Sequence, residues 1–226
     1  TRFLAIYHHG KPAVIGPVRS ARPHFIHLER EYGATYVHCG QSYEALQLFS
    51  TTPGISHLDQ MKYGKPFWRD RSRRAPHNLY ASAEKLRAQA QQLGWSGAPP
   101  LLPSFTSDRT LTAGERATQI DISFGGAVKY KLQFVYDAAR GGYVRYLDGR
   151  LHVDRETREP IVATNILIQR VETKRYPSNP LHTYDVTVTG MGEGDFVSNQ
   201  HVIPLRWRKA WETDITSYTD ENGRAL

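Results

Sequence analysis

A short proline-rich stretch divides this chain of 226 residues and limits how it can fold. Residues 96–104 contain three prolines, so the helix-like sequence before them cannot continue. Before the stretch the pattern alternates between strand and helix, whereas after it the pattern is almost entirely that of strands. We therefore predict an α+β protein: an α/β amino-terminal domain at 1–95, a linker at 96–104 and a β-rich domain at 105–226.

The amino-terminal part alternates strand-like and helix-like sequence. Residues 2–7 and 34–40 favour strands because apolar and aromatic side chains concentrate in them. Helices are expected to begin near Ser20 and Ser42, since serine is a good N-cap residue, and Gly33 is expected to end the first helix. This order predicts a mostly parallel or mixed sheet, in which ligands would lie beyond the carboxyl ends of the strands.

Two further segments complete this domain. Residues 53–80 are rich in turn formers and basic side chains, and they are predicted to form one long ordered loop without regular structure. The aromatic residues Phe67 and Trp68 favour order in this loop. Ser82–Leu93 has its apolar side chains on one face and is the clearest helix of the chain, with Gly94 at its end.

Strand-like runs separated by turn formers fill the chain beyond the linker. The predicted strands are 120–124, 128–136, 143–147, 161–171, 183–189 and 202–207. Turn sequences such as Asp148-Gly149 favour hairpins between them, and Gly190–Asp195 is predicted to be a flexible hairpin turn. The carboxyl-terminal domain is therefore expected to be mostly antiparallel.

Two basic segments are the strongest candidates for a functional site. Arg19 and Arg22 follow a Gly-Pro pair near the expected start of a helix, and a second run places four arginines between positions 69 and 74. Because a guanidinium group presents a planar fork of N–H donors, it suits carboxylate and phosphate groups. We predict that the segments meet and bind an anionic or sugar-like ligand. The predicted ligand-binding residues are Arg19, Arg22, His38, Arg69, Arg73, His77, Asn78 and Tyr80.

A structural reading of the same arginines stays open. Arg19 or Arg22 would then pair with an acidic side chain and tie the loops down, the candidates being Glu29, Glu31 and Asp70. The net charge of +7 and the isoelectric point near 9.5 favour acidic partners through long-range attraction, but they also serve solubility alone.

Other chemistry-bearing residues lack the patterns of known sites. The histidines and the one cysteine, Cys39, fit no compact zinc motif, so no metal is expected. His38 and Cys39 are adjacent in a predicted strand and point to opposite faces, which argues against a nucleophile and base pair. Four aspartates are assigned to turns and not to glycoside chemistry: Asp121, Asp137, Asp148 and Asp154. Without a dinucleotide fingerprint or Walker A motif, no cofactor is expected.

Several strings in both halves are similar to those of one family. In the first half they are residues 1–5, 15–23, 36–38, 67–70 and 75–80. In the second half they are residues 143–145, 165–169, 190, 207–209 and 218–220. In this order they resemble the YerB-like family of bacterial lipoproteins, a family of unknown function (number 3048), over essentially the whole chain.

The resemblance implies a two-domain extracytoplasmic protein, anchored by a lipid to the outer face of a Gram-positive-type cell membrane. Members usually begin with a lipobox and a further sheet-forming segment. Neither precedes Thr1, so we expect the amino-terminal part and the lipid anchor to be missing from this chain. The carboxyl end, just after a turn signal, also indicates a cut. The family has no established activity, and the resemblance therefore assigns no catalytic residue.

We expect a binding domain that recognises an anionic or glycan component of the cell envelope. The alternative is a cell-envelope enzyme acting on a glycan or acyl group, with His77 as general acid or base. Nucleic acid is not an expected partner, since no recognised module for it is present.

Overall fold

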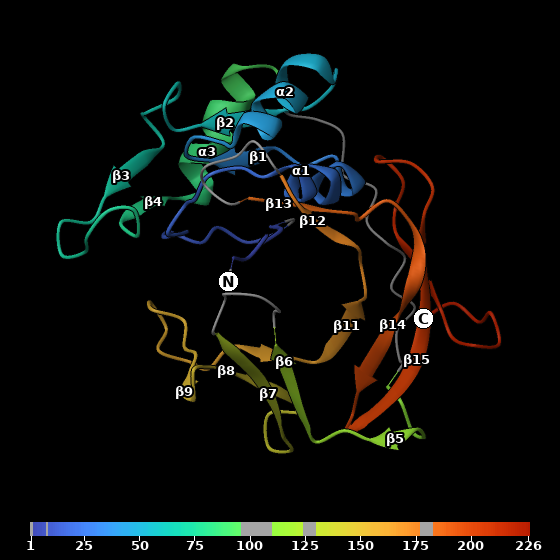
Figure 1. Cartoon of the computed structure of the whole chain (residues 1–226). Helices are drawn as coiled ribbons and strands as arrows, with labels where there is room; N and C mark the ends of the chain where they lie inside the picture. The colour runs from blue at the N-terminus through green and yellow to red at the C-terminus, as the bar shows by residue number, and fades with distance from the viewer. Residues whose placement is uncertain (1, 8, 96–109, 124–129, 177–182) are drawn as a thin grey trace.

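The computed structural model describes residues 2–7, 9–95, 110–123, 130–176 and 183–226. Helices and short strands form the amino-terminal part, and two larger antiparallel sheets form most of the remainder (Figure 1). The predicted α+β character is found. The predicted linker at 96–104 lies outside the described residues.

The helices begin and end largely where serine and glycine predict. They are α1 (Pro23–Glu29) with the 3₁₀ turn η1 (Arg30–Tyr32), α2 (Tyr43–Thr51) and α3 (Ala83–Gln92). The Oγ atoms of Ser42 and Ser82 accept capping hydrogen bonds from the third residue of their helices, at 3.3 Å in each case. Gly33 ends the first helical segment with a φ of +53°. The prediction for Ser20 is wrong, because Pro23 starts α1 and Arg22 precedes it.

The first half contains two pairs of short strands. Strands β1 (Tyr36–His38) and β2 (His57–Asp59) are parallel and are connected through α2, which is a small version of the predicted parallel sheet. Strands β3 (Phe67–Arg69) and β4 (Leu79–Ala81) form an antiparallel pair. The predicted unbroken loop at 53–80 is therefore wrong, because β2, β3 and the first two residues of β4 fall within it.

Residues 2–7 form no strand although they are well described, and this prediction is also wrong. Side-chain contacts draw them toward both halves of the chain. Leu4 packs on the core beneath α1 and α2, while the ring of Phe3 lies 4.6 Å from the Arg145 guanidinium in the second half. These apolar residues therefore contact both halves of the chain and do not pair as a strand, and Phe3 stays 59% exposed.

One sheet of the second half has the strand order β10-β8-β7-β6, with β9 added on β8. Its strands are β6 (Gln119–Ser123), β7 (Lys131–Asp137), β8 (Gly142–Leu147), β9 (Arg150–Leu151) and β10 (Val162–Ala163). Asp148 and Gly149 connect β8 to β9 with positive φ angles of 52° and 74°, as the Asp-Gly signal predicts.

The other large sheet has the order β11-β14-β15-β16, with β5 on β15. Its strands are β5 (Glu115–Arg116), β11 (Asn165–Gln169), β14 (Gly190–Ser198), β15 (His201–Lys209) and β16 (Ser217–Thr219). A separate hairpin of β12 (Thr173–Arg175) and β13 (Tyr184–Val186) contacts α1. The second half is antiparallel, as predicted.

The predicted hairpin turn at Gly190–Asp195 is wrong, because these residues form most of β14. A Cβ atom on Gly192 would lie 2.7 Å from Nε1 of Trp207, and one on Gly194 would collide with the backbone oxygen of Ile168. Glycine therefore allows close packing inside a sheet here. The turn comes later, at Asn199 and Gln200, which both have positive φ angles.

The two halves meet in a buried ion pair. Nζ of Lys209 lies 3.3 Å from Oε1 of Glu31, and the side chains of these residues are 0% and 5% exposed. Oε2 of Glu31 accepts hydrogen bonds from both the backbone N–H and the hydroxyl of Thr216, each at 2.8 Å. Nearby, Arg30 pairs with Glu212 at 3.1 Å. These contacts fix the first helical segment against β15 and the loop that follows it.

Candidate ligand site

A backbone pairing brings the two predicted basic segments together. Ile15 exchanges two hydrogen bonds with Ala81 of β4, and the Val18 N–H donates to the Leu79 carbonyl at 2.8 Å. Gly16 allows this approach, because a Cβ atom there would lie 2.7 Å from both the Leu79 oxygen and the Tyr80 ring. The pairing places Arg19 beside residues 69–78, which we call the arginine loop.

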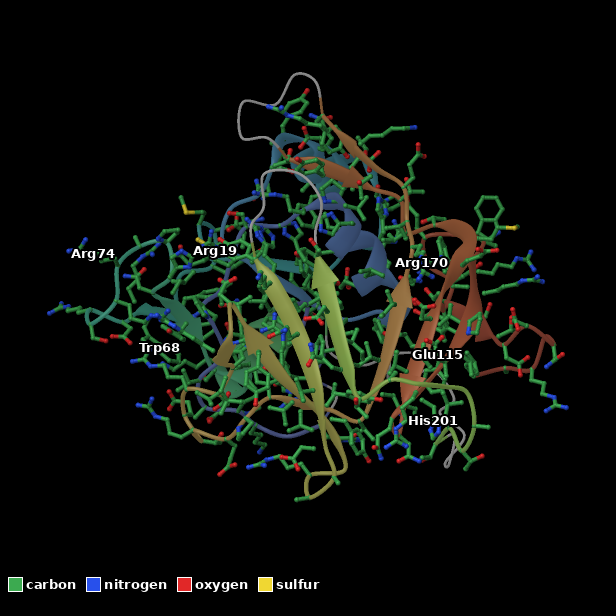
Figure 2. All side chains as sticks on the ribbon, turned by 60° about the horizontal axis from the view of Figure 1, so that its bottom comes forward. Arg19, Trp68, Arg74, Glu115, Arg170 and His201 are labelled. Carbon is green, nitrogen blue, oxygen red and sulfur yellow. The ribbon has the colours of Figure 1, made fainter. Side chains whose placement is uncertain are left out.

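Arg19 contacts the arginine loop directly. Its Nη1 donates to the Pro76 carbonyl at 3.2 Å and faces Nδ1 of His77 at 3.0 Å. Because arginine can only donate, Nδ1 is the accepting nitrogen of this histidine, and the proton of the neutral ring is on Nε2. Figure 2 shows Arg19, Trp68 and Arg74 on one side of the molecule and Arg170, Glu115 and His201 on the other.

Inside the arginine loop, two arginines are held by neutral acceptors. Nη1 of Arg69 donates to Oδ1 of Asn78 at 2.9 Å, and Nη1 of Arg73 donates to the Tyr80 hydroxyl at 2.5 Å. Asn78 is buried, and its amide group donates to the backbone oxygens of Asp70 and Arg73. The structure thus assigns Asn78 and Tyr80 the task of positioning arginines.

One member of the site was not found from the sequence. Arg155 comes from the turn between β9 and β10, and its Nη1 pairs with Asp70 at 2.7 Å and donates to the Tyr80 hydroxyl at 3.1 Å. Hydrogen bonds from Ser72 and then from Arg155 lower the pKa of Asp70 to about 2. Asp70 and Arg155 are 85 positions apart in the sequence, and no sequence pattern indicates their contact.

The acidic residues proposed as partners of Arg19 and Arg22 do not pair with them. Among the described residues, Asp70 pairs with Arg155 and Glu31 with Lys209, and no ion pair includes Arg19 or Arg22. Glu29 is 5% exposed, and its buried Oε2 has no hydrogen-bond partner among the described side chains and backbone groups. Burial raises the pKa of Glu29 to about 8. The ion-pair reading of the two predicted arginines therefore has no support in the described contacts.

Arg22 lies at the edge of the site with Arg2, a residue that sequence reasoning did not include. Nη1 of Arg22 donates to the Ala21 oxygen at 2.7 Å, and Nη1 of Arg2 donates to the Ser20 oxygen at 2.6 Å. Burial, followed by the positive charges of Arg22 and Arg19, lowers the pKa of Arg2 to about 10. The two side chains extend the positive surface from Arg19 toward α1.

His38 is not brought to this surface. Its side chain is 0% exposed, Nδ1 is 2.9 Å from the Gly40 carbonyl, and Nε2 is 2.9 Å from Nδ1 of His57. The ring also stacks on Phe49 with a centroid distance of 4.9 Å. A surface ligand could reach this ring only by displacing those contacts.

His77, the predicted acid or base of the enzymatic alternative, is exposed on the arginine loop. In the described part of the chain its ring faces Arg19, and no carboxylate contacts it. Among the residues of the described ranges, no cluster of three or more His, Cys, Asp or Glu side chains is placed to hold a metal ion. Within these ranges, too, no helix is both long and apolar enough to cross a membrane.

Comparison with known proteins gives the same family for both halves. The models described as "Protein of unknown function (DUF3048)" match residues 1–96 with their N-terminal domain and residues 120–226 with their C-terminal domain. The chain is 28% identical over 211 residues to the "Putative lipoprotein YerB" of Bacillus subtilis, covering 92% of this chain and 63% of that protein. It therefore spans less than two thirds of that relative.

The crystal structure of the YerB protein from Bacillus subtilis has a similar fold, with a TM-score of 0.76 at 26% identity. The match covers 95% of this chain and 71% of the YerB chain in that crystal structure. Both halves match models of one family in the same order, as the resemblance of their motifs predicts. The chain thus belongs to the DUF3048 family of proteins of unknown function.

Proposed function

We propose that this chain is an extracytoplasmic binding domain, which recognises an anionic component of the cell envelope through the arginine loop and Arg19. The extracytoplasmic location rests on the relative named as a lipoprotein. One observation carries the binding proposal: three arginines are held in place by neutral acceptors and not by carboxylates. They are Arg19, Arg69 and Arg73.

Such arginines keep their full charge and most of their donors. A guanidinium has five N–H groups, and the described contacts of each of these side chains use only one nitrogen. The arginine loop contains four arginines and one carboxylate, Asp70, and Arg19 and Arg155 add two cations, so these residues carry five net positive charges. Positioned, unneutralised guanidinium groups favour phosphate or carboxylate groups of a ligand, because little side-chain order has to be created on binding.

The test is thermal stability against inorganic phosphate, phosphorylated sugars and anionic wall fragments. A ligand that binds only the folded state raises the melting temperature by mass action. We expect a shift for the wild type, a much smaller one for Arg19→Gln/Arg73→Gln, and weakening of the shift in high salt.

The matched control is Arg206→Gln/Arg208→Gln, which removes the same charge from exposed positions of β15. This variant should keep the ligand-induced shift of the wild type. Equal shifts in all three proteins would show that the anion binds elsewhere, and a shift lost equally in both variants would show that net charge and not the arginine loop binds it.

A further inference from the structure

A shallow cleft of about 250 Å³ lies beside Trp68, next to the arginine loop. Trp68 of β3 forms one wall, the first turn of α3 another, and residues 11–13 the third. The polar groups at the cleft are the side chains of Lys11, Ser82, Glu84 and Lys85. The Trp68 ring is partly exposed, and Nζ of Lys85 lies 5.4 Å from its centroid.

The cleft is connected to the arginines through one residue. Trp68 is opposite Tyr80 in the β3–β4 pair, so both rings lie on the same face, with centroids 6.4 Å apart and planes 27° apart. The Tyr80 hydroxyl in turn accepts hydrogen bonds from Arg73 and Arg155. A ligand that lies on Trp68 therefore has the positioned guanidinium group of Arg73 within reach along the same face, beside the pair of Arg155 and Asp70.

The groups around the cleft match the chemistry of a sugar ring. A sugar has apolar C–H faces, which pack on an aromatic ring, and hydroxyl groups, which both donate and accept hydrogen bonds. The two lysines supply donors, Glu84 supplies an acceptor, and the Ser82 hydroxyl keeps its proton free because its oxygen accepts the capping bond from Lys85. The volume is slightly below the lower end of small-molecule pockets, roughly 300 Å³, and suits one sugar unit.

We infer that the cleft binds a sugar unit of an anionic glycan, with the ring on Trp68 and a phosphate or carboxylate substituent on Arg73, beside the pair of Arg155 and Asp70. The inference rests on the proposed function and narrows its ligand to a glycan that carries negative groups. Trp68, Glu84 and Lys85 become specificity-determining residues, whereas the arginines supply most of the attraction for the charge.

Single-stranded nucleic acid fits the same features less well. Successive bases of a single strand stack on successive exposed aromatic rings. Here Tyr80 is only 3% exposed and cannot stack on a base, so Trp68 is the aromatic ring that the cleft offers. The carboxylate of Glu84 would also repel a phosphate backbone that followed the cleft. A sugar hydroxyl, in contrast, gains an acceptor from that carboxylate.

The experiment compares N-acetylglucosamine 6-phosphate, inorganic phosphate and a thymidylate oligomer, using the whole chain. Affinities are measured by isothermal titration calorimetry, and contact with Trp68 is followed in the wild type by NMR at its indole N–H signal, assigned from its loss in Trp68→Ala. We expect Trp68→Ala to lower the affinity for the sugar phosphate about tenfold and the affinity for inorganic phosphate less than about twofold, because the variant removes apolar contact area that only the sugar ring uses. The control, Trp211→Ala, removes a tryptophan that is 74% exposed and should change neither affinity.

A second variant keeps the core intact. Glu84→Gln changes an exposed side chain on α3, and it should lower the ratio of sugar-phosphate to phosphate affinity by weakening the first and strengthening the second. If Trp68→Ala weakens both anions equally, the sugar subsite is wrong while anion binding stands. If the wild type binds neither anion, the proposed function is wrong and the inference falls with it. Tighter, Trp68-dependent binding of the thymidylate oligomer would overturn the assignment to a glycan.

Discussion

Two regions of this molecule hold positive charge in opposite ways. Between the halves, Lys209 is fully buried and lies against the carboxylate of Glu31. On the arginine loop, Arg69 and Arg73 are fixed by an amide oxygen and a hydroxyl, which are neutral. The buried cation is neutralised and therefore serves the fold, whereas the surface cations are positioned but not neutralised. The difference indicates where charge is structural and where it is available to a ligand.

The largest effect should come from breaking the buried pair. Lys209→Met leaves Glu31 buried without its cation, and we expect a loss of about 3–5 kcal/mol in the free energy of unfolding. Urea denaturation measures it. The exposed pair of Lys174 and Glu172 provides the control, because Lys174→Met should cost less than about 1 kcal/mol. Similar losses of unfolding free energy in both variants would show that the buried pair contributes no more to stability than an exposed one.

Glu29 tests what happens when a buried carboxyl has no cation. Burial raises its pKa from the ordinary value of 4.5 to about 8 in the folded chain, so the folded state holds an extra proton between these pH values. Stability therefore falls as pH rises through them. Glu29→Gln should remove this pH dependence, which amounts to about 3 kcal/mol in the free energy of unfolding between pH 5 and pH 8. The measurement is the difference between the two stability profiles. Parallel profiles would show that Glu29 is ionised in the folded state like an exposed carboxylate.

The next variant tests the close approach of Gly16 to β4, which places Arg19 beside the arginine loop. Gly16→Ala introduces a Cβ atom 2.7 Å from the Leu79 oxygen and the Tyr80 ring at a φ of +154°, and should cost about 2 kcal/mol of unfolding free energy. Gly64→Ala is the control, because no atom lies within 4 Å of its Cβ position, and it should change stability by less than about 0.5 kcal/mol. Equal stability of both variants would mean that residues 15–18 do not press on β4.

The smallest effects on stability are expected within the arginine loop. Arg69→Gln and Arg73→Gln each remove a hydrogen bond to a neutral partner near the surface, and each should cost less than about 1 kcal/mol in urea denaturation. Their effect should instead fall on anion affinity. A loss as large as that of Lys209→Met would assign these arginines to the fold and would remove the basis of the proposed site.

Sequence reasoning succeeded where the cause is local. Ser42 and Ser82 cap helices through atoms three residues away, and Asp148-Gly149 makes its hairpin because both residues adopt positive φ angles. It failed where distant packing decides. Residues 2–7 have the composition of a strand but contact both halves, and the glycines of β14 mark close packing against Trp207 and Ile168 and not a turn.

The same division applies to the candidate site. The meeting of Arg19 with the arginine loop was predicted, and the backbone pairing of residues 15–18 with β4 brings it about. The burial of His38 depended on its stacking with Phe49 and its bond to His57, and neither contact has a sequence signal. Arg155 was missed because it comes from the other half of the chain.

The position of Arg155 links ligand binding to the packing of the two halves. While Arg155 stays on Asp70, it neutralises the only carboxylate of the arginine loop. If the turn between β9 and β10 moved away, the uncompensated charge of Asp70 would repel an anion. By thermodynamic reciprocity, an anion bound at the proposed site would strengthen the contact between the halves as much as that contact would strengthen binding. The β-rich half would in this sense be an effector of a site built mainly by the amino-terminal half.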